Sequence, residues 1–192
     1  MATANKVKYN LKNVHVAKAT IADDGTATYD TPFAVPGAVS ISLEAQGDTA
    51  SFYADGIKYY VTTANNGYEG DLEVAMLPEK FLTDILGNYL DDSKVLIEDA
   101  DAKPVNFAIT FEFDGDINQI KHVLYNCVAT RPSIASQTKE DSVEVQTMTT
   151  TLTCSTIVAN GKNIVKGMTV AETDAEAYEG WHTAIHVPTV TA

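Results

Sequence analysis

The sequence predicts a mainly β fold with one short helix, built from two β-sheets that pack as a sandwich or barrel. Alternating apolar and polar residues recur roughly every dozen positions. The chain also holds 23 threonines, with many Val, Ile, Tyr and Phe, and these β-branched and aromatic side chains favour strands. Each run would bury one apolar face against a second layer.

Three runs give the clearest strand predictions, because apolar side chains occupy every second position in each. They are Val39-Ile41-Leu43, Leu72-Val74-Met76 and Phe107-Ile109-Phe111-Phe113. Turn signals separate the runs at Asp23-Asp24-Gly25, Asp55-Gly56, Asn66-Gly67, Asp114-Gly115 and Asn160-Gly161. The strand from Phe107 to Phe113, its Asp-Gly turn and the run from Ile120 to Ala129 predict a hairpin.

One segment has the pattern of a helix instead. Pro78 stands where a helix starts, Gly87 stands where it stops, and apolar residues lie between them at Phe81, Leu82, Ile85 and Leu86. The spacing predicts one short helix that packs on the sheets.

A chain of 192 residues has the length of one domain. Residues 1–156 carry the strand pattern and form the predicted β domain, including an N-terminal arm. Residues 157–192 differ: an acidic, Ala-rich stretch precedes an apolar cluster of Trp181, Ile185 and Val187. We interpret 157–192 as a C-terminal strand or arm region that is ordered on its own domain, docked along a neighbouring molecule, or mobile.

Charge and composition exclude several classes of function. The net charge is −13, and 12 of the 13 basic residues are Lys, which opposes electrostatic binding of nucleic acid. The apolar runs fall short of the ~18 to 20 residues that span a bilayer, and no secretory signal is recognisable. Cys127 and Cys154 are the only cysteines, and we expect both to be buried and reduced.

No set of residues predicts catalysis, a metal site or a cofactor. Asp114 to Asn118 begins like a calcium loop, but Gln119 replaces the required Gly and Tyr125 replaces the required Glu. His182 and His186 are four apart, yet a third ligand is missing, so packing of a terminal arm is the better interpretation. The carboxylates from residue 91 to 101 fit a solvated loop, and nucleophile and phosphate-loop motifs are absent.

Several sequence blocks occur together in a fixed order. They are Lys6-Val7-Lys8-Tyr9-Asn10-Leu11-Lys12-Asn13-Val14-His15, Phe52-Tyr53-Ala54-Asp55, Tyr59-Tyr60, Asn65-Asn66-Gly67-Tyr68-Glu69-Gly70-Asp71-Leu72-Glu73, Phe111-Glu112-Phe113-Asp114-Gly115-Asp116, His122-Val123-Leu124-Tyr125-Asn126-Cys127, Arg131-Pro132 and Thr138-Lys139-Glu140-Asp141-Ser142. In this order and spacing they resemble the major tail proteins of long-tailed, non-contractile bacteriophages (siphophages) of Gram-positive hosts. The resemblance covers about residues 5–156, and the segment after Ile157 matches poorly.

The resemblance implies a tail-tube fold of two packed sheets with a flanking helix. It further implies six subunits per ring, with rings stacked into a hollow conduit through which DNA leaves the capsid. The implied partners are copies of the chain itself, the tape-measure protein, and the tail terminator and tail-tip proteins. Phage DNA would pass through without specific binding, and no membrane is involved. The implied location is the virion tail, preceded by the host cytoplasm before assembly.

Within this framework the polar stretch 46–51 is expected to be an exposed loop or hairpin tip that reaches the next ring. The ring-stacking candidates are Gln46, Gly47, Asp48, Thr49, Phe52 and Tyr53, with the two aromatics as buried anchors. The terminal arms could make similar contacts, and their candidate anchors are Tyr9, Leu11, Trp181 and Ile185.

Three carboxylates are candidates for the wall of the tube. Glu69, Asp71 and Glu73 alternate with apolar residues that face the core, so they project together from one strand face. In the lumen their charge would repel sliding phosphates at short range. The sequence leaves open whether this face lines the lumen or the outer wall.

Two other classes of protein compete with this interpretation. One is an acidic β-sandwich binding module that recognises carbohydrate or protein through its loops. The lone Trp181 at the far C-terminus and the lack of aromatic platforms in loops speak against it. The other is an enzyme, which lacks a nucleophile with a base, a metal set and a phosphate loop. We therefore predict a structural, non-enzymatic protein that self-assembles.

Overall fold

The structure is a computed structural model that describes residues 7–115, 119–138, 145–170 and 172–189. The strands are β1 (Tyr9–Ile21), β2 (Ala27–Tyr29), β3 (Phe33–Ala34), β4 (Ala38–Ala45), β5 (Thr49–Ala54), β6 (Ile57–Thr63), β7 (Tyr68–Val74), β8 (Tyr89–Leu90), β9 (Leu96–Ile97), β10 (Phe107–Asp114), β11 (Lys121–Ala129), β12 (Met148–Ser155), β13 (Ile157–Ala159), β14 (Lys162–Ile164) and β15 (Lys166–Met168). The helices are α1 (Glu79–Asp84), α2 (Ala175–Glu179) and the 3-10 turn η1 (Gly180–His182).

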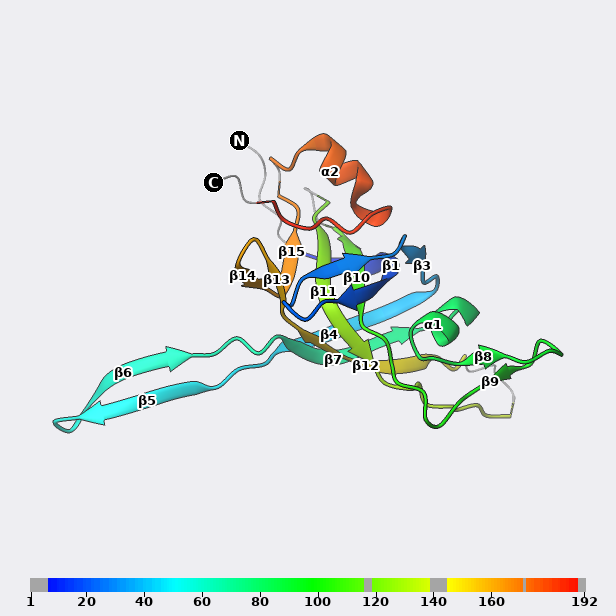
Figure 1. Ribbon diagram of the computed structural model, residues 1–192, viewed down its shortest axis with the longest axis horizontal. Coiled ribbons are helices and arrows are strands. Elements are labelled where there is room, and N and C mark those ends of the chain that lie inside the picture. Colours follow the sequence, from blue (N-terminus) through cyan, green and yellow to red (C-terminus); the bar gives the residue numbers. More distant parts are fainter. Residues whose placement is uncertain (1–6, 116–118, 139–144, 171, 190–192) are drawn as a thin grey trace.

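A nine-stranded antiparallel sheet bends over on itself to make two packed layers (Figure 1). One layer holds β2, β1, β10 and the first half of β11, and the other holds β12, β7 and β4. Between them lies a core of wholly buried side chains that includes Leu72, Phe107, Ile109 and Leu152. The predicted mainly β fold with packed sheets is therefore confirmed, and the described strand order stays open at β2 and β4 instead of closing a barrel.

Strand β11 joins the two layers, because its two halves pair with different neighbours. His122 to Leu124 pair with β15, whereas Asn126 to Ala129 pair with β12. The predicted hairpin of β10 and β11 is confirmed, with Phe107 opposite Cys127 and Glu112 opposite Lys121.

Two of the predicted strand positions are wrong. Ile41 and Leu43 pack against the core, but Val39 is exposed, because the register between β4 and β7 is irregular between Ala38 and Ser40. Leu72 and Val74 are wholly buried. Met76 lies beyond the end of β7, where strand alternation no longer directs its side chain, and it is exposed.

The predicted short helix is confirmed as α1. Pro78 caps its start, and Gly87 follows its end with a φ of +80°, a conformation that glycine adopts without a steric penalty. Phe81 is wholly buried and meets Phe107 edge to face, with ring centroids 5.8 Å apart. The helix therefore closes one side of the core.

The outer face of β10 and β11 is covered by the C-terminal segment. This cover includes the short helix α2, which the sequence analysis did not predict and whose N-cap Asp174 accepts hydrogen bonds from the Glu176 and Ala177 amides. Trp181 is buried against Val123 and Tyr125, and its Nε1 donates to the His122 carbonyl at 3.2 Å. As a result, residues 107 to 112 of β10 are buried on both faces.

Replacing the indole that holds this cover is expected to destabilise the fold. Trp181→Ala should lower the free energy of unfolding by about 3 to 5 kcal/mol, because a large buried side chain is lost and the cover loosens. Urea unfolding of dilute protein measures the loss.

The matched control is Tyr9→Ala, which removes an exposed aromatic and should change the same quantity by less than about 0.5 kcal/mol. Equal effects of the two substitutions would contradict the packing of Trp181 on its own chain.

Candidate functional site

A long hairpin of β5 and β6 projects from the body of the molecule (Figure 1). The two strands pair only with each other among the described residues, and every residue of β6 is exposed. A lone two-stranded hairpin has marginal stability in water. We call residues 46–66 the arm.

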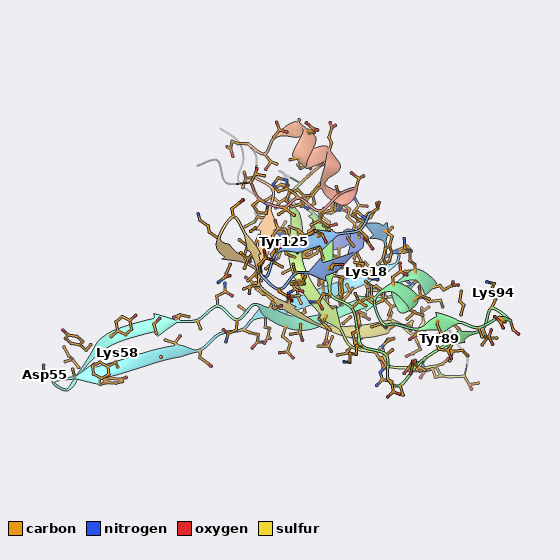
Figure 2. All side chains as sticks on the ribbon, viewed as in Figure 1. Lys18, Asp55, Lys58, Tyr89, Lys94 and Tyr125 are labelled. Atoms are coloured by element: carbon orange, nitrogen blue, oxygen red, sulfur yellow. The ribbon has the colours of Figure 1, made fainter. Side chains whose placement is uncertain are left out.

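The far end of the arm is an Asp-Gly turn. Asp55 and Gly56 have φ angles of +52° and +76°, as a two-residue hairpin turn requires. Figure 2 places Asp55 and Lys58 at this end, far from the body. Phe52 lies opposite Tyr60, and the register then slips by one residue, so that Tyr59 is the extra residue of a bulge.

Large apolar side chains project from the arm, and they are exposed to solvent. The exposed residues are Phe52, Tyr53, Ile57, Tyr59, Tyr60 and Val61, at 47% to 69% of their full surface. Exposed aromatic clusters of this kind mark protein–protein contact sites. Sequence reasoning singled out Phe52 and Tyr53 but missed the contribution of β6.

The predicted loop at residues 46–51 lies at the base of the arm and not at its tip. The amide of Gln46 donates to the Gly67 carbonyl at 2.9 Å, and Ala64 donates to the Asp48 carbonyl at 3.0 Å. A Cβ on Gly47 would stand 2.0 Å from the Ala64 carbonyl oxygen, so only glycine fits there. Gln46, Gly47 and Asp48 therefore attach the arm, Thr49 begins β5, and the expectation of a tip there is corrected.

A second candidate surface is the outer face of β4, β7 and β12. Glu69, Asp71 and Glu73 project from β7, opposite the core-facing Leu72 and Val74. Pairing places hydroxyl-bearing and acidic residues on both sides: Ser40, Ser42 and Glu44 from β4, and Thr149, Thr151 and Thr153 from β12. This acidic face carries four carboxylates. No salt bridge within the described part of the chain neutralises any of them.

Hydroxyl groups donate hydrogen bonds to two of these carboxylates. Thr151 Oγ1 donates to Asp71 at 2.7 Å, Thr147 Oγ1 donates to Glu73 at 2.6 Å, and Ser40 Oγ donates to Glu73 at 2.9 Å. The bonds from Thr147 and Ser40 lower the pKa of Glu73 below its usual value. These bonds thus favour the ionised form of Glu73 on the acidic face.

The candidate anchors of the N-terminal and C-terminal segments have different surroundings. Tyr9 is exposed at the start of β1, whereas Leu11 is buried in the main core. Trp181 and the half-buried Ile185 belong to the second core, under the C-terminal cover. In this structure Leu11, Trp181 and Ile185 therefore contact their own chain.

A small polar network lies beneath the cover. Nδ1 of His182 lies 2.9 Å from Thr110 Oγ1, and its ring stacks on His15 with centroids 5.0 Å apart. The buried Glu112 carboxylate lies 3.8 Å from His182 Nε2 and accepts a hydrogen bond from the Asn13 amide. Burial, aided by the neighbouring His15, lowers the pKa of His182 to about 4.

The histidine pair of the sequence does not converge on a metal site. His182 faces His15, whereas His186 stacks on Trp181. Among the described residues no group of three His, Cys, Asp or Glu side chains is arranged to hold a metal. Part of the calcium-like loop, residues 116–118, lies outside the described residues.

Two surfaces therefore stand out on the packed sandwich, an exposed aromatic arm and an acidic sheet face, and among the described residues neither is covered by the rest of the chain. A family model described as phage tail tube protein matches residues 3–191. The chain belongs to this family and is a structural protein of the phage tail, consistent with a major tail protein of a siphophage. This match extends through residues 157–191, where the sequence blocks alone showed a poor match to the family.

Among solved structures, the chain is similar to one chain of "Cryo-EM structure of the anti-feeding prophage (AFP) baseplate, 6-fold symmetrised", with 10% identity and a TM-score of 0.40. That match covers 90% of this chain and 99% of the other. No curated protein sequence matches significantly. Neither helix of the described chain has the length and apolar character needed to cross a bilayer.

Acid should weaken the C-terminal cover through His182. His182 takes up a proton near pH 6.5 in the unfolded chain but only near pH 4 in the folded chain. Its contribution to the free energy of unfolding is therefore complete above pH 6.5 and is lost as the pH falls toward 4. The loss should be about 2 kcal/mol, because burial, aided by the neighbouring His15, disfavours the imidazolium in the folded chain and Glu112 compensates only in part. Urea unfolding at a series of pH values measures it.

In His182→Gln the free energy of unfolding should depend less steeply on pH between 6.5 and 4. The exposed His186→Gln is the control and should retain the slope of the wild-type protein. A wild-type slope in His182→Gln would show that other groups cause the acid sensitivity.

Proposed function

We propose that this protein is the major tail-tube subunit, which assembles into hexameric rings that stack into a hollow conduit for phage DNA. The observation that carries the proposal is the arm, because a lone hairpin with six exposed large apolar side chains needs a partner surface. A second copy supplies that surface in a homopolymer, through a heterologous contact that repeats.

The arm and a second exposed apolar surface lie at opposite ends of the molecule. Figure 2 shows Tyr89 and Lys94 at the end opposite Asp55 and Lys58. The hairpin of β8 and β9 at that end exposes Tyr89, Leu90 and Val95. Copies that stack in the same orientation bring the arm of one to the β8–β9 end of the next, which supports a head-to-tail contact between rings.

Lateral closure of a ring would use the free edge of β4. This eight-residue strand pairs with β7 on one side and ends the described strand order on the other. An open edge of this length invites pairing with another chain, and closure into a ring satisfies it.

The acidic face is the surface that we assign to the lumen. The outer face of the other layer is covered by the C-terminal segment, whereas the acidic face is lined by carboxylates and hydroxyls and has no cover from the described residues. Carboxylates repel DNA phosphates within a Debye length of about 8 to 10 Å, so DNA would slide without being held.

The remaining partners follow from the family and from the proposed tube. The tape-measure protein would occupy the lumen during assembly, and the terminator and tail-tip proteins would contact the two open ends. The subunit would be made in the host cytoplasm and then incorporated into the virion.

Removal of the aromatic pair on the arm should block stacking and leave the fold intact. In Phe52→Ser/Tyr60→Ser, tube formation should fall at least about 10-fold, because two contact anchors are lost. The Tm should stay within about 1 °C, because the arm contributes no core contacts. Negative-stain electron microscopy with light scattering across a concentration series measures assembly.

The control Phe52→Tyr/Tyr60→Phe retains both rings and should assemble like the wild-type protein. Normal tubes from the serine variant would contradict the role of the arm. A wild-type protein that stays monomeric at high concentration, even with tail-tip complexes added, would contradict the proposed function.

Charge reversal on the acidic face tests its assignment to the lumen. Phage that carry Asp71→Lys/Glu73→Lys should eject DNA several-fold more slowly, because lysines in the lumen retain phosphates. Phage with Glu172→Lys/Glu179→Lys carry the same change in total charge on exposed positions of the C-terminal cover and should eject at the normal rate. Equal ejection rates for the two variants would contradict the assignment of the acidic face to the lumen.

A further inference from the structure

The two cysteines face each other across the junction of the two layers. Cys127 in β11 lies directly opposite Cys154 in β12, and their Sγ atoms are 2.6 Å apart. Both thiols are free and buried in the main core. Neither has a part in the tail-tube contacts proposed above.

The strand register favours a bond between them. Directly opposed residues in an antiparallel pair alternate between hydrogen-bonded and non-hydrogen-bonded positions. The Thr130 amide donates to the Thr151 carbonyl at 2.9 Å, and these residues continue the same register, so they mark a hydrogen-bonded position. Three steps away, Cys127 and Cys154 occupy a non-hydrogen-bonded position, where Cα atoms approach to about 4.5 Å, within the range that disulfides span.

Their surroundings keep the thiols unreactive until an oxidant reaches them. Burial, together with the contact to Cys154, raises the pKa of Cys127, so little thiolate is present at neutral pH. Large thiol reagents have no access to the folded core, but a molecule as small as hydrogen peroxide can penetrate by local opening. Once one sulfur is oxidised, its partner is already in place.

We propose that Cys127 and Cys154 are an oxidation site that closes into a disulfide staple between β11 and β12. Peroxide converts one thiol to a sulfenic acid and releases one water. The second thiol then attacks that sulfur, forms the S–S bond and releases another water. Two thiols and one peroxide thus give one disulfide and two waters, with the cysteines oxidised and the peroxide reduced.

The staple strengthens the strand pair through which β11 connects the two layers. It acts where the second half of β11 passes to β12, so it resists separation of the layers without altering the exposed surfaces. Its biological use rests on the proposed function. Subunits made in the reducing cytoplasm would stay unbridged, and released virions would meet oxidants outside the cell.

The test uses the full-length unassembled protein with and without hydrogen peroxide, followed by denaturation and thiol counting. Peroxide should remove both titratable thiols and lower the intact mass by about 2 Da, with a faster-migrating monomer on a non-reducing gel. The Tm should rise by about 5–10 °C and return to its original value after reduction with dithiothreitol.

Cys127→Ala and Cys154→Ala are the matched controls, and neither should give the reversible rise in Tm. The wild-type comparison with and without reductant keeps the test valid if an alanine variant folds poorly. Two remaining thiols, sulfinic acids or cross-linked dimers after peroxide treatment would overturn the proposal. Because these readouts do not require rings, failure of the staple and failure of tube assembly are separable results.

Discussion

The pairing of strand β11 with two different partners is the constraint on which the architecture depends. Its first half pairs with β15 and its second half with β12, so one strand belongs to both layers of the sandwich. The core closes because the sheet bends at this strand, which brings Leu72 and Leu152 into one cluster with Phe107 and Ile109. Every external surface of the molecule is positioned relative to that cluster.

The two outer faces of the sandwich have opposite chemistry. The face of β10 and β11 is sealed by Trp181 and the C-terminal segment, which leaves Thr110 and Glu112 buried in a hydrogen-bonded network. The face of β4, β7 and β12 carries hydroxyls and carboxylates, and no described segment of the chain covers it. The two faces therefore differ in chemistry within a single subunit, as the proposed assignment of one of them to the lumen requires.

Local patterns in the sequence predicted the elements whose side chains face the core. The β10–β11 hairpin and α1 were predictable, because apolar periodicity and turn residues lie within each segment. The extent of the arm was not, since β5 and β6 expose both faces and alternation then carries no burial signal. Alternation placed Glu69, Asp71 and Glu73 on one face, but their hydroxyl neighbours depend on pairing between distant strands. Helix α2 was missed because five residues carry little periodic signal and depend on a cap and on Trp181.

In the proposed tube, the isolation of the arm would give growth a threshold concentration of subunits. An arm with no support from its own domain samples many conformations, and fixing it costs conformational entropy that a single encounter between two subunits repays poorly. In the proposed tube, an end that already presents several ordered arms would repay that cost repeatedly, so growth on that end would be favoured over the start of a new tube. New tubes would then need a higher subunit concentration to start than existing tubes need to grow, and a template would decide where each tube begins.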